Sequence, residues 1–173
     1  MRLVEMLIKL ASGTTHEGWL GVNVPPELRA RLRLLHRYIR PDDLAEDGIE
    51  RDPHITVAFG LDKELPEDKV SQLLKLPRGA RIKLGGLNMF QNPDSDVLKF
   101  DVDSEDLQRI HKQIEKEIGI PGKTFKDYNP HVSVAYLKKG SKLEKYKALE
   151  RMLKGKEFQA DKIRLTLGDN KYE

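Results

Sequence analysis

The chain contains the stretch Pro53-His54-Ile55-Thr56-Val57-Ala58-Phe59 and repeats it 77 residues later as Pro130-His131-Val132-Ser133-Val134-Ala135-Tyr136. Four of the seven positions are identical, and the other three are like-for-like exchanges. Both copies follow a proline and are rich in β-branched and aromatic residues, which is typical of a short strand. We therefore predict two matched strands, and the rest of the chain is interpreted around them.

Side chains alternate between the two faces of a strand, so each copy divides into two sets. In the first copy one set is His54, Thr56 and Ala58, and the other is Ile55, Val57 and Phe59. The second copy divides in the same way and places His131 and Ser133 together. The aliphatic and aromatic set must be buried. A buried polar group costs free energy unless it is satisfied, so the repeated imidazole and hydroxyl indicate a functional face.

The regions around the two copies also correspond. Periodicity and terminal signals predict strands at 19–24, 81–90, 98–102 and 158–167, and helices at 25–39, 66–76, 104–118 and 143–153. Ser141 and Glu144 have capping-box spacing for the last helix, and Gly85-Gly86 predicts a bulge or bend. Residues 40–52 are interpreted as a polar loop. The 77-residue offset relates 66–76 to 143–153 and 81–90 to 158–167, which favours a duplication.

The expected fold class is α+β. We predict one domain over residues 1–173, built from duplicated strand-helix-strand-helix-strand halves with pseudo-two-fold symmetry around a central cleft. The two lobes are expected at 19–92 and 95–168, after an N-terminal extension at 1–18. In this arrangement both histidine faces line a single groove.

Composition narrows the class of protein. The chain has no cysteine, which excludes disulfides, thiolate nucleophiles and Cys-ligated metals. Its net charge of +3 suits a phosphate-bearing ligand without indicating a general nucleic-acid coat. Glu5 and Lys9 interrupt the apolar N-terminal stretch, and no run reaches membrane-spanning length. We expect a cytoplasmic monomer with no membrane partner.

Paired His-x-Thr/Ser-x tetrads, one in each half of a duplicated α+β domain, resemble the two-histidine (2H) phosphoesterase superfamily, which includes 2′-5′ RNA ligases and cyclic phosphodiesterases. The resemblance covers about residues 19–168. It implies metal-independent, cofactor-free chemistry on a 2′,3′-cyclic phosphate or 2′-5′ linkage of RNA or nucleotides, reversible as ligation. It also implies that His54 and His131 form the acid-base pair and that Thr56 and Ser133 bind the phosphate.

The residues themselves suit this chemistry. Opening a cyclic phosphate requires one proton to be removed from the nucleophile and one to be supplied to the leaving oxygen. Histidine titrates near 6.5, so neutral and protonated imidazoles can coexist at neutral pH. A hydroxyl two residues along the strand lies about 6.5–7 Å from each histidine on the same face and can donate to phosphate oxygens. Neither histidine is assigned as the acid or as the base.

Three other interpretations stay open. The histidines could bind a metal, but neither copy offers a third ligand. The chain could be an RNA-binding module without turnover, using the Arg29, Arg33 and Arg37 stripe, which otherwise is a solvated helix face. It could also be a phosphodiesterase that acts on a cyclic dinucleotide or on ADP-ribose cyclic phosphate.

A basic and aromatic segment leads into the second motif strand. Its residues Lys123, Phe125, Lys126 and Tyr128 are candidates for a lip that stacks on a base. The remaining histidines, His16, His36 and His111, lack a paired hydroxyl, and we interpret them as structural or solvent-exposed.

Overall fold

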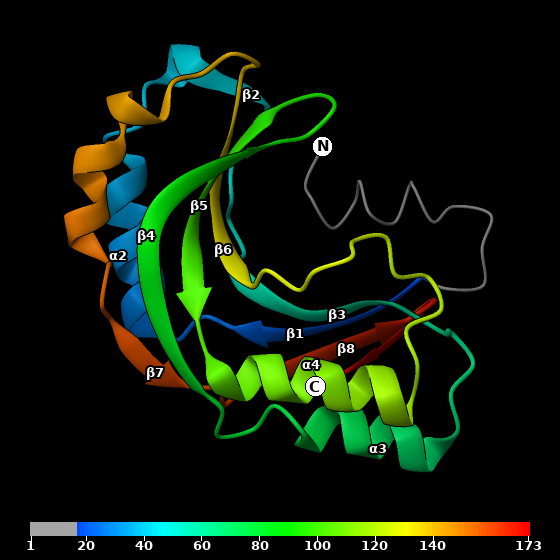
Figure 1. Ribbon diagram of the computed structural model, residues 1–173. Coiled ribbons are helices and arrows are strands. Elements are labelled where there is room, and N and C mark those ends of the chain that lie inside the picture. Colours follow the sequence, from blue (N-terminus) through cyan, green and yellow to red (C-terminus); the bar gives the residue numbers. More distant parts are fainter. Residues whose placement is uncertain (1–16) are drawn as a thin grey trace.

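The computed structural model describes residues 17–173 (Figure 1). Its strands are β1 (Gly18–Asn23), β2 (Leu44–Ile49), β3 (His54–Leu61), β4 (Arg81–Gln91), β5 (Asp96–Asp103), β6 (His131–Leu137), β7 (Glu157–Gln159), β8 (Ile163–Leu167) and β9 (Asn170–Tyr172). Its α-helices are α2 (Pro26–His36), α3 (Glu67–Lys75) and α4 (Glu105–Glu117), and its 3-10 helices are η1 (Pro41–Asp43), η2 (Leu143–Lys145) and η3 (Lys147–Met152). Within this described part, no helix has the length and apolar character needed to span a membrane.

The strands form one curled antiparallel sheet in the order β7-β4-β5-β6-β3-β1-β8-β9, and β2 pairs with β6 outside this path. Figure 1 shows the long β4 bending around one side of the sheet. The 77-residue offset relates β1 to β5, β3 to β6 and β4 to β8. In the strand order β4-β5-β6-β3-β1-β8, the two strands of each related pair therefore lie at equal distances from the centre. Each half of the chain therefore places its third strand beside strands of the other half. The two motif strands meet at the centre, where they pair only at Ile55 and Val132.

The helices also cross between the halves. Helix α2 follows β1 but contacts β6, and α4 follows β5 but contacts β3. Their predicted apolar stripes face the core: Leu28, Leu32 and Leu35 from α2, and Leu107, Ile110 and Ile114 from α4 are buried. Ser104 begins α4 by accepting a hydrogen bond from the Leu107 amide at 3.1 Å. The α+β prediction is confirmed, with the helices outside the curled sheet (Figure 1).

Both motif strands carry a β-bulge at the same position of the repeat. Leu20 and Gly21 of β1 pair with Ala58 and Thr56, so Val57 is an extra residue. In β6 the equivalent extra residue is Val134, because Leu98 and Lys99 pair with Ala135 and Ser133. A bulge reverses the alternation of side chains beyond it. The prediction that Phe59 shares a face with Ile55 and Val57 is therefore wrong: Phe59 and Tyr136 pack with Trp19 and Val97 in a separate cluster.

Several other local predictions are corrected. Residues 44–49, expected within a loop, form β2. The expected helix at 143–153 is two 3-10 helices, and the proposed capping box is absent because the Ser141 hydroxyl donates to the Lys138 carbonyl instead. The predicted strand at 158–167 is interrupted between β7 and β8. The bulge expected at Gly85-Gly86 is confirmed by a register shift between Leu84 and Leu87. The predicted N-terminal extension up to residue 16, including His16, lies outside the described residues.

Candidate active site

The two motif histidines have the same local geometry. His54 begins β3 and His131 begins β6, next to the single point where these strands pair. The Nδ1 atom of His54 donates to the Asp52 carbonyl at 2.8 Å, and Nδ1 of His131 donates to the Asn129 carbonyl at 3.0 Å. A carbonyl oxygen can only accept, so each neutral ring is protonated on Nδ1. Nε2 of each ring is thereby left as the atom available for proton transfer.

An aromatic ring supports each histidine. Trp19 contacts His54 edge-on with 5.1 Å between ring centroids, and Phe90 contacts His131 in the same way at 5.3 Å. The Trp19 ring lies over Gly21, where an added Cβ would be 2.2 Å from the indole. Glycine at this position is therefore required by the close approach of the ring.

The two predicted hydroxyls lie beside the histidines. Thr56 Oγ1 accepts a hydrogen bond from the Trp19 indole N–H at 3.0 Å, which leaves its own proton free to donate to a ligand. Ser133 is buried and lies opposite Lys99 of β5. The repeat predicts both hydroxyls, but nothing in the sequence indicates Trp19 or Lys99 as their neighbours.

The surroundings lower the pKa of both motif imidazoles, and burial is the main cause in each case. Burial lowers the pKa of His54, although the Asp52 carbonyl and the Glu50 carboxylate oppose this effect. Burial lowers the pKa of His131 to about 4, and the positive charges of Lys99 and His54 act in the same direction. Ile55 and Val132 pair directly, so His54 and His131 precede paired residues on adjoining strands.

A cavity of about 440 Å³ is lined by Thr56 and His131, whereas His54 and Ser133 are not among its lining residues. Its lining includes residues of the sheet and the segment 123–129, which we name the rim. Among the sheet residues are Thr56, Phe59, Phe90, Lys99 and His131. The four candidate lip residues all contribute to this lining.

The lip residues differ in what they can contact. Phe125 is 59% exposed. Tyr128 instead donates to the Thr56 carbonyl at 2.9 Å and stacks on His111. Phe125 is thus the ring that can meet a ligand, and Tyr128 holds the rim against β3.

The sequence profile of the 2′-5′ RNA ligase superfamily matches residues 69–171, which is more than half of the 173-residue chain. This chain belongs to the 2′-5′ RNA ligase superfamily. The matched segment contains His131 and Ser133 and begins after His54 and Thr56. No curated protein matches the chain.

Solved structures share the fold of this superfamily member at low sequence identity. TT0787 of Thermus thermophilus is 23% identical with a TM-score of 0.58, and the match covers 86% of each chain. Usb1 of Kluyveromyces marxianus with uridine monophosphate is 12% identical with a TM-score of 0.55, covering 92% of this chain and 98% of that one. LigT of E. coli in apo form is 14% identical with a TM-score of 0.52, covering 87% and 86%. The expected 2H phosphoesterase fold is confirmed.

In this superfamily member two further histidines secure the motif strands. His111 of α4 donates from Nδ1 to the Val57 carbonyl at 2.7 Å, and His36 of α2 donates from Nε2 to the Val134 carbonyl at 3.0 Å. These acceptors are the two bulge residues, and each histidine comes from the other half of the chain. The interpretation of His36 and His111 as structural residues is confirmed. The sequence does not predict that they donate to the carbonyls of the two bulge residues.

Around His54, charged groups form a supporting network. Arg164 of β8 donates to the Asp52 carboxylate at 2.6 Å and lies 5.3 Å over the Trp19 ring. Arg29 also lies 4.0 Å from Asp52 and donates to the Val24 carbonyl, so it does not share the solvated face predicted for the arginine stripe. Arg33 and Arg37 are exposed and do not line the cavity.

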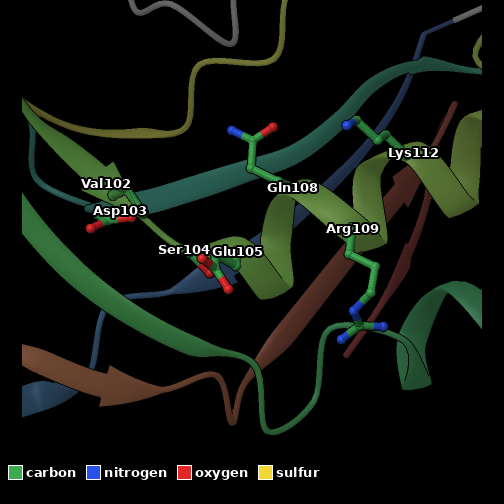
Figure 2. Close-up of a pocket in the computed structure, with 7 residues that line it drawn as sticks. All are labelled: Val102, Asp103, Ser104, Glu105, Gln108, Arg109 and Lys112. Carbon is green, nitrogen blue, oxygen red and sulfur yellow. The ribbon is translucent and has the colours of Figure 1, made fainter.

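A different hollow of about 430 Å³ lies at the N-terminal end of α4 (Figure 2). Figure 2 shows Gln108 and Lys112 extending from one side of that helix and Arg109 from the other. No motif histidine or hydroxyl lines it. Among residues 17–173, no group of three or more His, Cys, Asp or Glu side chains is arranged to hold a metal ion. The cavity beside His131 is therefore the candidate active site.

Proposed function

We propose that this protein is a phosphodiesterase that opens a 2′,3′-cyclic phosphate or a 2′-5′ linkage of RNA or nucleotides by acid-base catalysis. The observation that carries the proposal is the matched histidine pair. Both rings use Nδ1 to bind a carbonyl two residues earlier, which leaves Nε2 of His54 and His131 for proton transfer. Membership of the 2′-5′ RNA ligase superfamily supports the class of reaction.

In the hydrolytic direction, water attacks phosphorus and the bond from phosphorus to the 3′ oxygen breaks. One neutral imidazole takes the water proton, and the other, in its protonated form, supplies a proton to the 3′ oxygen, leaving a 2′-phosphate. Burial lowers the pKa of both imidazoles, so either can act as the base, and the two roles are not assigned individually. An anionic phosphate bound between them raises both pKa values toward neutrality. Ligation uses a 5′ hydroxyl in place of water and keeps the same two roles. Cleavage of a 2′-5′ linkage, in which the 3′ hydroxyl attacks phosphorus and the 5′ oxygen leaves, reverses them.

Thr56 and Ser133 are proposed to donate to the non-bridging oxygens, where negative charge increases in the transition state. The Trp19 indole occupies a lone pair of Thr56, so the Thr56 proton is directed to another acceptor. Phe125 is proposed to stack on a base beside the cavity, since its ring is exposed on the rim. Usb1 has been solved with uridine monophosphate and LigT with 3′-AMP, which agrees with a nucleotide ligand.

The test is a product assay with His54→Asn and His131→Asn. Asparagine keeps a donor near the Nδ1 position and removes Nε2, so the carbonyl bond can persist while proton transfer is lost. The panel contains 2′,3′-cyclic mononucleotides, an RNA ending in a cyclic phosphate, 2′-5′ oligoadenylate, a 3′-5′ cyclic dinucleotide and a plain 3′-5′ oligomer. We expect wild-type turnover of one of the first three, unaffected by a chelator. Each variant should lose about 10²-fold or more, and the double variant less than the product of both losses.

Three results would contradict the proposal. Cleavage of the plain oligomer alone would indicate a general nuclease. Salt-sensitive RNA binding with no turnover across the panel would favour the RNA-binding module, for which exposed Phe125 and the neighbouring Lys126 would supply stacking and phosphate contacts. Turnover of the cyclic dinucleotide alone would identify the third candidate function.

A further inference from the structure

The two halves of the site differ in the residues that face the motif. In β1, Asn23 lies opposite His54 and Gly21 lies opposite Thr56. In β5, Asp101 lies opposite His131 and Lys99 lies opposite Ser133. A charged pair therefore occupies one half of the site at positions where the other half has an amide and a glycine.

Lys99 is held in place beside the cavity. Its side chain is only 13% exposed, and its ammonium group donates to the Asp101 carboxylate. Asn88 donates to the other oxygen of that carboxylate at 3.2 Å. The ammonium nitrogen also lies 5.9 Å from the centre of the Phe90 ring, which in turn contacts His131. An ammonium group has three donors, and a single carboxylate oxygen does not use them all.

The other lysines of this cavity are placed differently. Lys123 is paired with Glu115 of α4 at 2.8 Å, and Lys126 lies on the exposed rim. Lys99 alone among the three lysines lining the cavity comes from the sheet, in the strand that pairs with β6. It is therefore the cation next to the predicted phosphate ligand Ser133.

We propose that Lys99 binds the phosphate group of the substrate together with Ser133 and His131, making this side of the groove the stronger anion subsite. The proposal rests on the proposed phosphodiesterase function. As charge increases on the non-bridging oxygens, the fixed ammonium group stabilises the transition state without having to reorient. Asp101 holds the ammonium in position before substrate arrives, and Lys99 is therefore a binding residue, whereas Asp101 is a positioning residue.

The direct test measures anion binding without any turnover. Inorganic phosphate is titrated into the protein while the ring protons of His131 are followed by NMR. Lys99→Met keeps an unbranched apolar side chain and removes the charge, and Lys99→Gln serves as a second variant if the first is poorly folded. We expect phosphate affinity to fall by about 10- to 100-fold, as for a lost hydrogen bond to a charged group. The pKa of His131 should rise in the free variant, because Lys99 lowers it in the wild type.

The matched control is Lys83→Met. Lys83 lies in β4, pairs with Glu157 at 3.8 Å and lines a different hollow, so its loss should change neither phosphate affinity nor the His131 titration. A purely structural ion pair would leave phosphate affinity the same in Lys99→Met and wild type, and this result would overturn the proposal.

A second measurement separates this proposal from the proposed function. On the substrate that the wild type turns over, Lys99→Met should lose about 10²- to 10³-fold in kcat, with partial rescue by Lys99→Arg. If phosphate binding depends on Lys99 but the protein turns over nothing on the panel, the anion subsite would stand and the phosphodiesterase function would be contradicted. Full turnover by Lys99→Met would contradict the proposal that Lys99 binds phosphate, while the proposed phosphodiesterase function would stand.

Discussion

Replacing His131 by asparagine should make the protein less sensitive to acid. The imidazole of His131 has a pKa of about 4 in the folded protein, because burial and then Lys99 disfavour its charged form, against an ordinary value of 6.5. The folded state thus binds this proton less readily than the unfolded chain does. Asparagine does not titrate, and its amide can replace Nδ1 as the donor to the Asn129 carbonyl.

The sign and size of the effect follow from these two pKa values. At pH 7 His131 is neutral in both the folded and the unfolded state, so its titration contributes almost nothing to the free energy of unfolding. As the pH falls through 6.5, His131 binds a proton in the unfolded chain, whereas in the folded protein it binds one only near pH 4. The free energy of unfolding should therefore decrease by up to about 1.4 kcal/mol per pH unit in this window, and by about 3 kcal/mol in total between pH 7 and pH 4.

The assay is urea unfolding of wild type and His131→Asn at half-unit steps from pH 7 to pH 4. All other titrating groups are shared, so they cancel in the difference between the two proteins. We expect that difference to change by about 3 kcal/mol in favour of the variant as the pH falls. Parallel curves for the two proteins would show that His131 titrates normally in the folded state and would refute the electrostatic account of the site.

Two further predictions concern the support of the groove. His111→Phe removes the donor to the Val57 carbonyl, and we expect a loss of about 1–3 kcal/mol in urea unfolding, together with a lower kcat in the product assay because the β3 bulge is released. Stability loss without any change in kcat would show that the bond does not position the motif. Gly60→Ala should raise KM, because Gly60 has φ +96° and an added Cβ would meet the Gly122 backbone at 2.4 Å, displacing the cavity rim. An unchanged KM would show that the rim does not contact substrate.

The sequence predicts the parts of the fold that depend on local pattern. Apolar spacing and terminal residues indicate helices α2, α3 and α4, and repetition indicates the motif strands. The region after Ser141 is misleading because Leu143, Tyr146 and Leu149 recur every three residues, a spacing that also fits a 3-10 helix. Strand β2 is not predicted because its segment, LAEDGI, shows no regular alternation.

The site is predictable only as far as the repeat extends. His54, His131, Thr56 and Ser133 are the repeated polar positions, and the structure brings them to adjoining strands, although their roles stay predictions. Lys99 belongs to the asymmetric part of the site, and its position beside Ser133 depends on a strand register that periodicity does not specify. Arg164 likewise reaches Asp52 only because β8 pairs with β1.

The twin bulges explain why the two halves form one site. A bulge removes one residue from the ladder, so the Val57 carbonyl needs another donor, whereas the Val134 carbonyl already accepts from the Glu50 amide at 2.9 Å. His111 supplies the donor to Val57, and His36 adds a second donor to Val134, each from a helix of the opposite half. Because the third strands are exchanged as well, an isolated half would lack both a sheet neighbour and the donor that satisfies its own motif strand. The hydrogen bonds by which His111 and His36 secure the two motif strands therefore depend on the two halves folding together.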